Sequence, residues 1–150
     1  MPISDMPKDI PLFNNFSVEE MKLLVEMNQP IRHYEKDDYL IKEGDHSTTL
    51  FLLTKGICRI TRHQDGANIQ LARLKPGEIC GEISWVSGKP RQSNVIANEA
   101  VTAMEMDREF FDRIKPEMSN KIKDYLIELL INRLDNMNEA IMRISKLMRA

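Results

Sequence analysis

The sequence contains few of the residues on which several common kinds of site depend. Its two cysteines, Cys58 and Cys80, form no C-x-x-C pair and no zinc-ligand spacing. Its three histidines, His33, His46 and His63, stand apart and include no H-x-H pair of the kind that cupin metal sites use. We therefore predict no metal, no cofactor, and two reduced, half-buried thiols.

Long apolar runs and a strong charge of one sign are also missing. No run approaches the roughly 18 apolar residues that a membrane span needs, and the first eleven residues lack the basic and apolar regions of a signal peptide. The net charge is −2, so no strongly basic surface points to nucleic acid. No H-E-x-x-H motif or Ser-His-Asp arrangement is visible, and a haem or iron–sulfur sensor would need more cysteines or a placed histidine. We expect a cytoplasmic protein that is not an enzyme and binds neither nucleic acid nor membrane.

The 150 residues suffice for one folded core, and their patterning changes along the chain. Ser17 followed by Glu20 is a capping box, which predicts a short amphipathic helix over 17–28. The apolar stretch 10–13 before it is expected to pack on the part that follows. Short β-rich runs separated by turn signals then predict an antiparallel sandwich or jelly-roll barrel. The runs are 31–35, 39–43, 49–54, 57–63, 68–74, 93–97 and 101–107.

The remainder of the chain has a helical pattern. Asp107 can cap one short helix, and Pro116 suits the first position of a second helix that continues without Gly or Pro to the end. We therefore divide the chain into 1–115, an N-terminal helix and a barrel, and 116–150, a long C-terminal helix. The predicted fold class is α+β: an antiparallel β jelly-roll barrel with a short N-terminal helix, a short helix in one long connection and a long C-terminal helix.

The long C-terminal segment carries an apolar seam. Its apolar residues repeat at alternating intervals of three and four, which is typical of coiled-coil heptads. The seam consists of Ile127, Leu130, Leu134, Met137, Ile141, Ile144 and Met148. The helix either packs along its own barrel or meets a partner helix. At 1.5 Å per residue it would be about 45 Å long, which a barrel of roughly 75 residues is not expected to cover. We therefore favour a homodimer through a parallel coiled coil.

Residues 76–94 form a connection with an unusual composition, since they hold three of the six glycines. Glu82 would begin one or two helical turns, whose free N–H groups favour an anion, and Gly81 would let a ligand approach the backbone. Arg91 lies ten residues after that glycine and suits bidentate phosphate binding. The carboxylate of Glu82 suits a sugar hydroxyl. These side chains together predict a site for a small phosphorylated sugar.

The same connection resembles the phosphate-binding segment of the cyclic nucleotide-binding domain family, of the catabolite activator protein and protein kinase A regulatory subunit type. The family pattern is approximately G-E-x-small-apolar, a short spacer, and R followed by small or polar residues. Here it reads Gly81-Glu82-Ile83-Ser84-Trp85, a spacer, and Arg91-Gln92-Ser93. LIKEGD at 40–45 and LFLLTKG at 50–56 fit the upstream pattern. The similarity covers about residues 12–148.

The resemblance implies cAMP or cGMP as the ligand. It implies that Arg91 pairs with the cyclic phosphate and that Glu82 accepts a hydrogen bond from the ribose 2′-hydroxyl. Further members of the site would be the backbone and motif positions Gly81, Ile83, Ser84, Gln92 and Ser93. Candidates for the pocket around the base are Ile60, Leu71, Arg133, Asn136 and Asn138. Departures from the usual family residues are Ser47, Cys80, Trp85 and Ser93, and we expect Trp85 to lie in the core rather than against the base.

The function that the resemblance implies is that of a sensor. Ligand would favour one arrangement of the phosphate-binding segment, which would bias the C-terminal helix for an unknown downstream protein to read. In related activators a DNA-binding motif follows this helix, but we find no second recognition-helix pattern and do not predict DNA binding by this chain. The alternative is a non-ligand-binding dimerisation scaffold of the same fold. The presence of both Glu82 and Arg91 favours the sensor.

Overall fold

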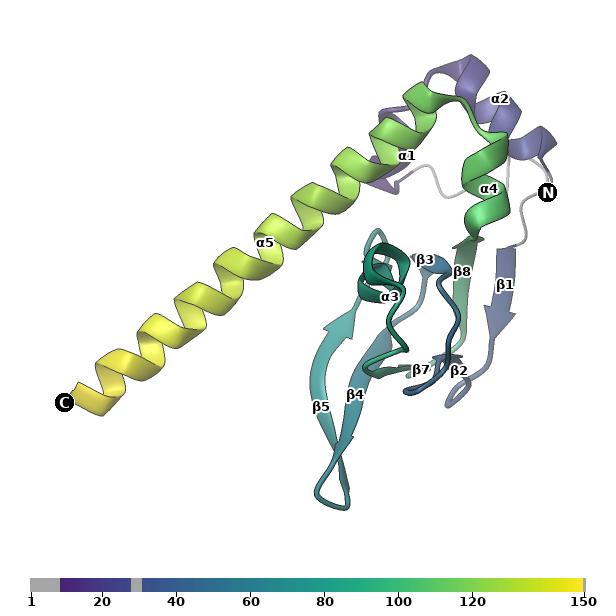
Figure 1. Cartoon of the computed structure of the whole chain (residues 1–150). Helices are drawn as coiled ribbons and strands as arrows, with labels where there is room; N and C mark the ends of the chain where they lie inside the picture. The colour runs from purple at the N-terminus through teal and green to yellow at the C-terminus, as the bar shows by residue number, and fades with distance from the viewer. Residues whose placement is uncertain (1–8, 28–30, 150) are drawn as a thin grey trace.

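The structure is a computed structural model that describes residues 9–27 and 31–149 (Figure 1). It is a mixed α and antiparallel β fold, as predicted. The helices are α1 (Pro11–Asn14), α2 (Val18–Glu26), α3 (Glu82–Ser87), α4 (Arg108–Arg113) and α5 (Pro116–Arg149). The strands are β1 (Ile31–Tyr34), β2 (Tyr39–Ile41), β3 (Leu50–Lys55), β4 (Cys58–Gln64), β5 (Ala67–Leu74), β6 (Ile79–Cys80), β7 (Asn94–Ala97) and β8 (Val101–Met106).

The strands form two antiparallel sheets, with the orders β1-β8-β3-β6 and β2-β7-β4-β5. The first sheet is covered on both faces. Leu50 and Leu52 of β3 pack against the helices, whereas Phe51 and Leu53, which alternate with them, pack in the core between the sheets. This double burial explains the continuous apolar run in β3.

The core between the sheets also contains both cysteines. Cys58 and Cys80 are free thiols, as predicted. Both are buried, whereas the sequence analysis predicted that they are half-buried. Burial raises the pKa of the Cys58 thiol to about 11 and also raises the pKa of the Cys80 thiol. Both thiols therefore stay protonated near neutral pH, which makes them packing residues.

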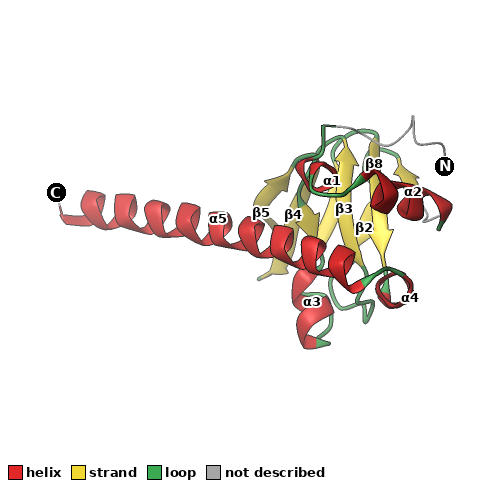
Figure 2. Cartoon of the chain, turned by 90° about the horizontal axis from the view of Figure 1, so that it is seen from above, coloured by secondary structure: helices red, strands yellow, loops and turns green. Residues whose placement is uncertain are grey.

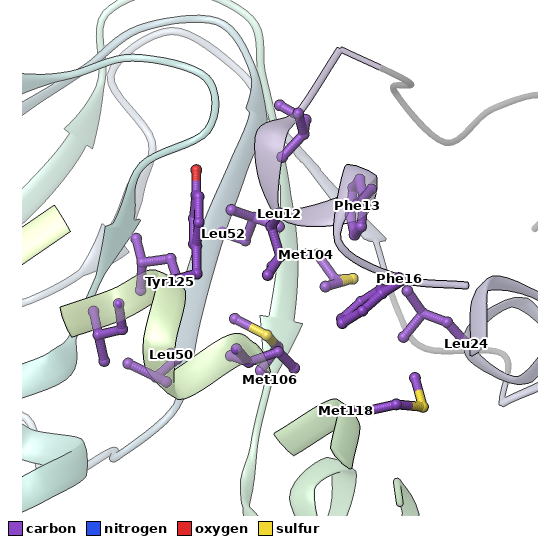
Figure 3. Packing of buried hydrophobic residues seen from close by; sticks show 14 of the residues in the cluster. Leu12, Phe13, Phe16, Leu24, Leu50, Leu52, Met104, Met106, Met118 and Tyr125 are labelled. Atoms are coloured by element: carbon purple, nitrogen blue, oxygen red, sulfur yellow. The ribbon is translucent and has the colours of Figure 1, made fainter. Parts of the chain in front are cut away.

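A second core joins the helices to the outer face of the first sheet (Figure 3). The apolar stretch 10–13 packs there, as expected from the sequence. The labelled side chains of this core are Leu12, Phe13, Phe16, Leu24, Leu50, Leu52, Met104, Met106, Met118 and Tyr125. Because α5 contributes residues to this core, the start of the long helix is fixed on the barrel.

The predicted helix caps are present. The Ser17 hydroxyl accepts from the Glu20 N–H at 3.1 Å, and the Glu20 carboxylate accepts from the Ser17 N–H at 2.9 Å. The same carboxylate accepts from Lys121 Nζ at 2.5 Å, which lowers the pKa of Glu20 and ties α2 to α5. Asp107 caps α4 as predicted, through the Phe110 N–H. The predicted end of the first amphipathic helix, at residue 28, lies outside the described residues.

The long helix α5 leaves its own barrel after its first turns. Met118, Ile122, Tyr125 and Leu126 are buried, and Leu130 is partly buried against the same core. Beyond them the helix projects past the edge of the strands (Figures 1 and 2). The other seam residues are between 52% and 81% exposed: Ile127, Leu134, Met137, Ile141, Ile144 and Met148. The barrel therefore covers only the beginning of the seam, and a partner helix remains a prediction.

Two short elements were not predicted from the sequence. Helix α1 has four residues and β6 has two, so neither is long enough to show a periodic pattern. In the described part of the chain, no helix combines the length and the apolar character that crossing a membrane requires.

Candidate functional site

A cavity lies where the connection from β6 into α3 meets the segment that precedes β7. Its empty space, including the open mouth, is about 430 Å³. It is lined by Ile41, Ile60, Cys80, Gly81, Glu82, Ile83, Ser84, Arg91, Gln92, Ser93, Val95 and Arg133. The structure therefore brings the seven predicted motif residues to one cavity, together with one side chain from the long helix.

Gly81 is required by the geometry of this cavity. It precedes α3 in the left-handed conformation, with φ at 92°, which favours glycine. A Cβ atom at this position would lie 2.7 Å from the Thr49 carbonyl oxygen and 2.8 Å from Arg91 Nη1. The absence of a side chain thus lets the guanidinium approach the backbone at the start of α3.

The guanidinium of Arg91 is buried against main-chain carbonyls. Nη1 donates to the Gly81 carbonyl at 3.0 Å and Nη2 donates to the Thr49 carbonyl at 2.6 Å. Arg91 is 4% exposed, and this burial lowers its pKa, although an arginine remains charged at neutral pH. No salt bridge to Arg91 occurs among the described residues. A buried cation without a contacting carboxylate is costly, and an anion in the cavity would offset that cost.

The carboxylate of Glu82 is engaged by α5. Its Oε1 atom lies 3.1 Å from Arg133 Nη1, and Arg133 Nη2 donates to the Ile79 carbonyl at 2.6 Å. The Glu82 side chain is 18% exposed and the Arg133 side chain is 32% exposed, so the pair is partly buried. The ion pair joins the connection at residues 79–82 to α5, since Arg133 lies 51 positions after Glu82 in the sequence.

The remaining predicted base-pocket residues lie in different places. Ile60 and Arg133 line the cavity. Leu71 is 54% exposed on β5, Asn138 is exposed on α5, and Asn136 lines a separate groove between α5 and the turn at 75–78. None of these three contributes to the cavity lining in this structure, so their contact with a ligand stays a prediction.

Sequence reasoning missed three lining residues, Ile41, Cys80 and Val95. Ile41 and Val95 are paired across β2 and β7. No sequence signal marks this pairing, because it joins residues 54 positions apart. Cys80 was noted as a departure from the family but was not assigned to the cavity.

The tryptophan is expected in the core; Trp85 is partly buried, packs against the core of the helices and does not line the cavity. The ring centroids of Trp85 and Phe111 are 5.2 Å apart, with an angle of 39° between the ring planes, so α3 packs against α4. Within the described part of the chain, no group of three or more His, Cys, Asp or Glu side chains could hold a metal ion. The polar chemistry of the site is therefore that of one arginine, one glutamate and main-chain groups.

Comparisons with known proteins point to one family. The family model for the cyclic nucleotide-binding domain matches residues 31–115. The chain is 30% identical over 139 residues to human cGMP-dependent protein kinase 2, a match that covers 89% of this chain and only 18% of that enzyme. It therefore corresponds to a small part of that relative.

Solved structures agree with the family match. A cyclic nucleotide-binding domain from Methylobacillus flagellatus has the same fold, with a TM-score of 0.79 at 24% identity, covering 94% of this chain and 83% of that one. The catabolite activator protein of Thermus thermophilus has a TM-score of 0.71 at 27% identity, covering 90% of this chain and 63% of that one. The model match spans more than half of the chain, and it includes the glycine, glutamate and arginine of the cavity. The chain therefore belongs to the cyclic nucleotide-binding domain family.

Proposed function

We propose that this domain binds cAMP or cGMP in the cavity, with Arg91 paired to the cyclic phosphate. The observation that carries the proposal is the buried guanidinium, which lines the cavity and has no ion-pair partner among the described residues. An anionic phosphate supplies the missing charge. The N–H groups near Gly81, Ile83, Gln92 and Ser93 complete the anion site, and no metal or cofactor takes part.

Binding is coupled to the long helix through Glu82. A ribose 2′-hydroxyl that donates to this carboxylate competes with Arg133 for the same oxygen atoms. Since α5 contains no Gly or Pro after Pro116, a displacement at Arg133 is carried along the helix toward its C-terminus rather than absorbed at a kink. A ligand that changes the Glu82–Arg133 contact therefore changes the position of the whole exposed half of α5.

The exposed seam of α5 serves as the dimer interface. Its apolar residues from Leu134 to Met148 are exposed on the part of the helix that projects past the strands, so the barrel of the same chain does not cover them. A second copy in a parallel coiled coil buries the same residues on both chains. The assembly is a non-enzymatic regulatory module whose helix position is read by a downstream protein, without DNA binding by this chain.

A ligand-free scaffold of the same fold is the second candidate, because α5 alone suffices for dimerisation. Thermal unfolding of the chain with and without each nucleotide separates the two candidates. At about 100 times the dissociation constant, ligand stabilises the folded state by roughly 2.7 kcal/mol. For this size the expected rise in Tm is about 5–10 °C. No shift with millimolar cAMP or cGMP would reject the sensor and favour the scaffold.

Replacement of Arg133 by glutamine tests the coupling. The variant loses the ion pair to Glu82, so ligand no longer has a charged contact to displace on α5. We expect ligand to change amide hydrogen exchange in residues 127–140 of the wild type but not of the variant, while the dissociation constant changes by less than about tenfold.

Arg143→Gln is the matched control for this variant. Arg143 lies on the same helix, is exposed, and pairs with Glu139, four positions away, at 3.5 Å. Its exchange should leave the response of residues 127–140 unchanged. A full response in Arg133→Gln would show that the Glu82 contact does not couple the cavity to α5.

A further inference from the structure

The turn at residues 43–45 holds the backbone of Arg91. The Gly44 N–H donates to the Arg91 carbonyl at 2.8 Å, and the Arg91 N–H donates to the Asp45 carbonyl at 2.7 Å. These residues end the stretch LIKEGD at 40–45, of which only Ile41 lines the cavity among the described residues. Two main-chain bonds fix Arg91 relative to the turn, so the position of the guanidinium depends on what fixes the turn.

Asn94, the first residue of β7, provides that link. Its Oδ1 atom accepts from the Glu43 N–H at 2.8 Å, and its Nδ2 atom donates to Thr61 Oγ1 at 3.2 Å. Thr61 is buried on β4. The Glu43 carboxylate adds a second tie, since it accepts from the His63 N–H at 2.9 Å. One carboxamide thus connects the turn at 43–45, strand β4 and strand β7.

The side chain of Asn94 acts at a distance from the cavity. Its neighbours Arg91, Gln92, Ser93 and Val95 line the cavity, whereas Asn94 does not. A bidentate guanidinium–phosphate contact requires a fixed planar fork, so a small displacement of the Arg91 backbone weakens it. We propose that Asn94 is a positioning residue that holds Arg91 in place for the ligand phosphate. This inference rests on the proposed function of the cavity.

Asn98 offers a matched control, because it follows the same strand and also makes a side-chain hydrogen bond. Its Oδ1 atom accepts from Arg59 Nη1 at 2.7 Å, at the other end of β7 from Arg91. Asn94→Leu and Asn98→Leu therefore remove comparable amides, one at the first residue of β7 and one just after its last residue. Asn94→Asp is the conservative variant, since it keeps an acceptor for the Glu43 N–H.

The experiment titrates the four proteins with cAMP and with cGMP by calorimetry and records the ³¹P resonance of the bound nucleotide at saturation. We expect Asn94→Leu to raise the dissociation constant about five- to tenfold and to move the bound ³¹P resonance toward that of the free nucleotide. Asn98→Leu should leave both quantities unchanged, and Asn94→Asp should recover most of the affinity.

Each outcome separates this inference from the function on which it rests. Unchanged affinity and ³¹P resonance in Asn94→Leu, or equal weakening in Asn98→Leu, would overturn the positioning role while wild-type binding stands. Absence of binding by the wild type would instead reject the proposed function. Should Asn94→Leu fail to fold, Thr61→Val is the second variant, because it removes the hydroxyl that accepts the hydrogen bond from Asn94 Nδ2. We expect it to raise the dissociation constant and to move the ³¹P resonance in the same directions, by smaller amounts.

Discussion

Replacement of Arg91 by alanine is expected to raise the dissociation constant for the cyclic nucleotide at least about thirtyfold and to abolish the thermal shift. Truncating one partner of a buried, hydrogen-bonded charge pair costs about 2–5 kcal/mol in binding. Arg91 is the buried cation of the cavity, and its guanidinium donates to the main-chain carbonyls of Gly81 and Thr49. Among the described residues, no other guanidinium is bonded to these two carbonyls. Calorimetric titration of the variant with cAMP and cGMP measures the loss directly.

The alanine variant also leaves the Gly81 and Thr49 carbonyls without this donor, which by itself destabilises the fold by about 1–3 kcal/mol. Arg91→Lys separates the two effects, because it keeps the charge but loses the planar fork. We expect it to bind at least about tenfold more weakly than the wild type. Arg59→Ala is the matched control, since Arg59 is also partly buried and bonds to Asn98 and Asp37 outside the cavity. Binding within threefold of wild type in Arg91→Ala would remove the basis of the proposed site.

The second large effect is expected on the α5 seam. Leu134→Glu places two carboxylates opposite one another in a parallel coiled coil, where each would be buried without a partner. The dimer should weaken at least about a hundredfold, so that the chain sediments at its monomer mass of 17.4 kDa instead of twice that value. Because Leu134 is exposed in the single chain, the fold of the barrel should be unaffected.

Met142→Glu is the control for this variant. Met142 is 61% exposed, close to the 58% of Leu134, but it lies outside the seven-residue seam. Its exchange also replaces an apolar side chain by a charge, and it should leave the dimer intact. Equal dissociation by both variants would reject the predicted register. A wild-type chain that is monomeric at every concentration would reject the dimer itself, without bearing on ligand binding.

Local sequence signals predicted where several helices begin. Ser17 and Glu20 fixed the start of α2, Asp107 that of α4, and Pro116 that of α5. These signals are reliable because a cap satisfies free N–H groups within three residues of itself. The glycine, glutamate and arginine at 81, 82 and 91 likewise reach one cavity, since ten residues of chain bring the last of them back to the first.

The tertiary structure decided the positions that depend on distant pairing. The pairing of β4 with β5 passes from Ala72 directly to Gln70, which leaves Leu71 as an extra, exposed residue at a bulge, and its predicted contact with the base stays a prediction. Ile41 and Val95 line the cavity because the register of β2 and β7 places them opposite each other. A sequence pattern of period two predicts that a strand exists, but not which residue lies opposite.

The sequence by itself determined the chemistry of the site and the apolar seam of the last helix. Only the tertiary structure decided that Arg133 reaches Glu82, that Asn94 ties the turn at 43–45 to β4, and that the barrel covers little of the seam. The physical reason is the range of the interactions involved. Caps, heptads and short motifs act between neighbours along the chain, whereas the side-chain contacts of Asn94 and the contact between Glu82 and Arg133 join residues 33 to 51 positions apart.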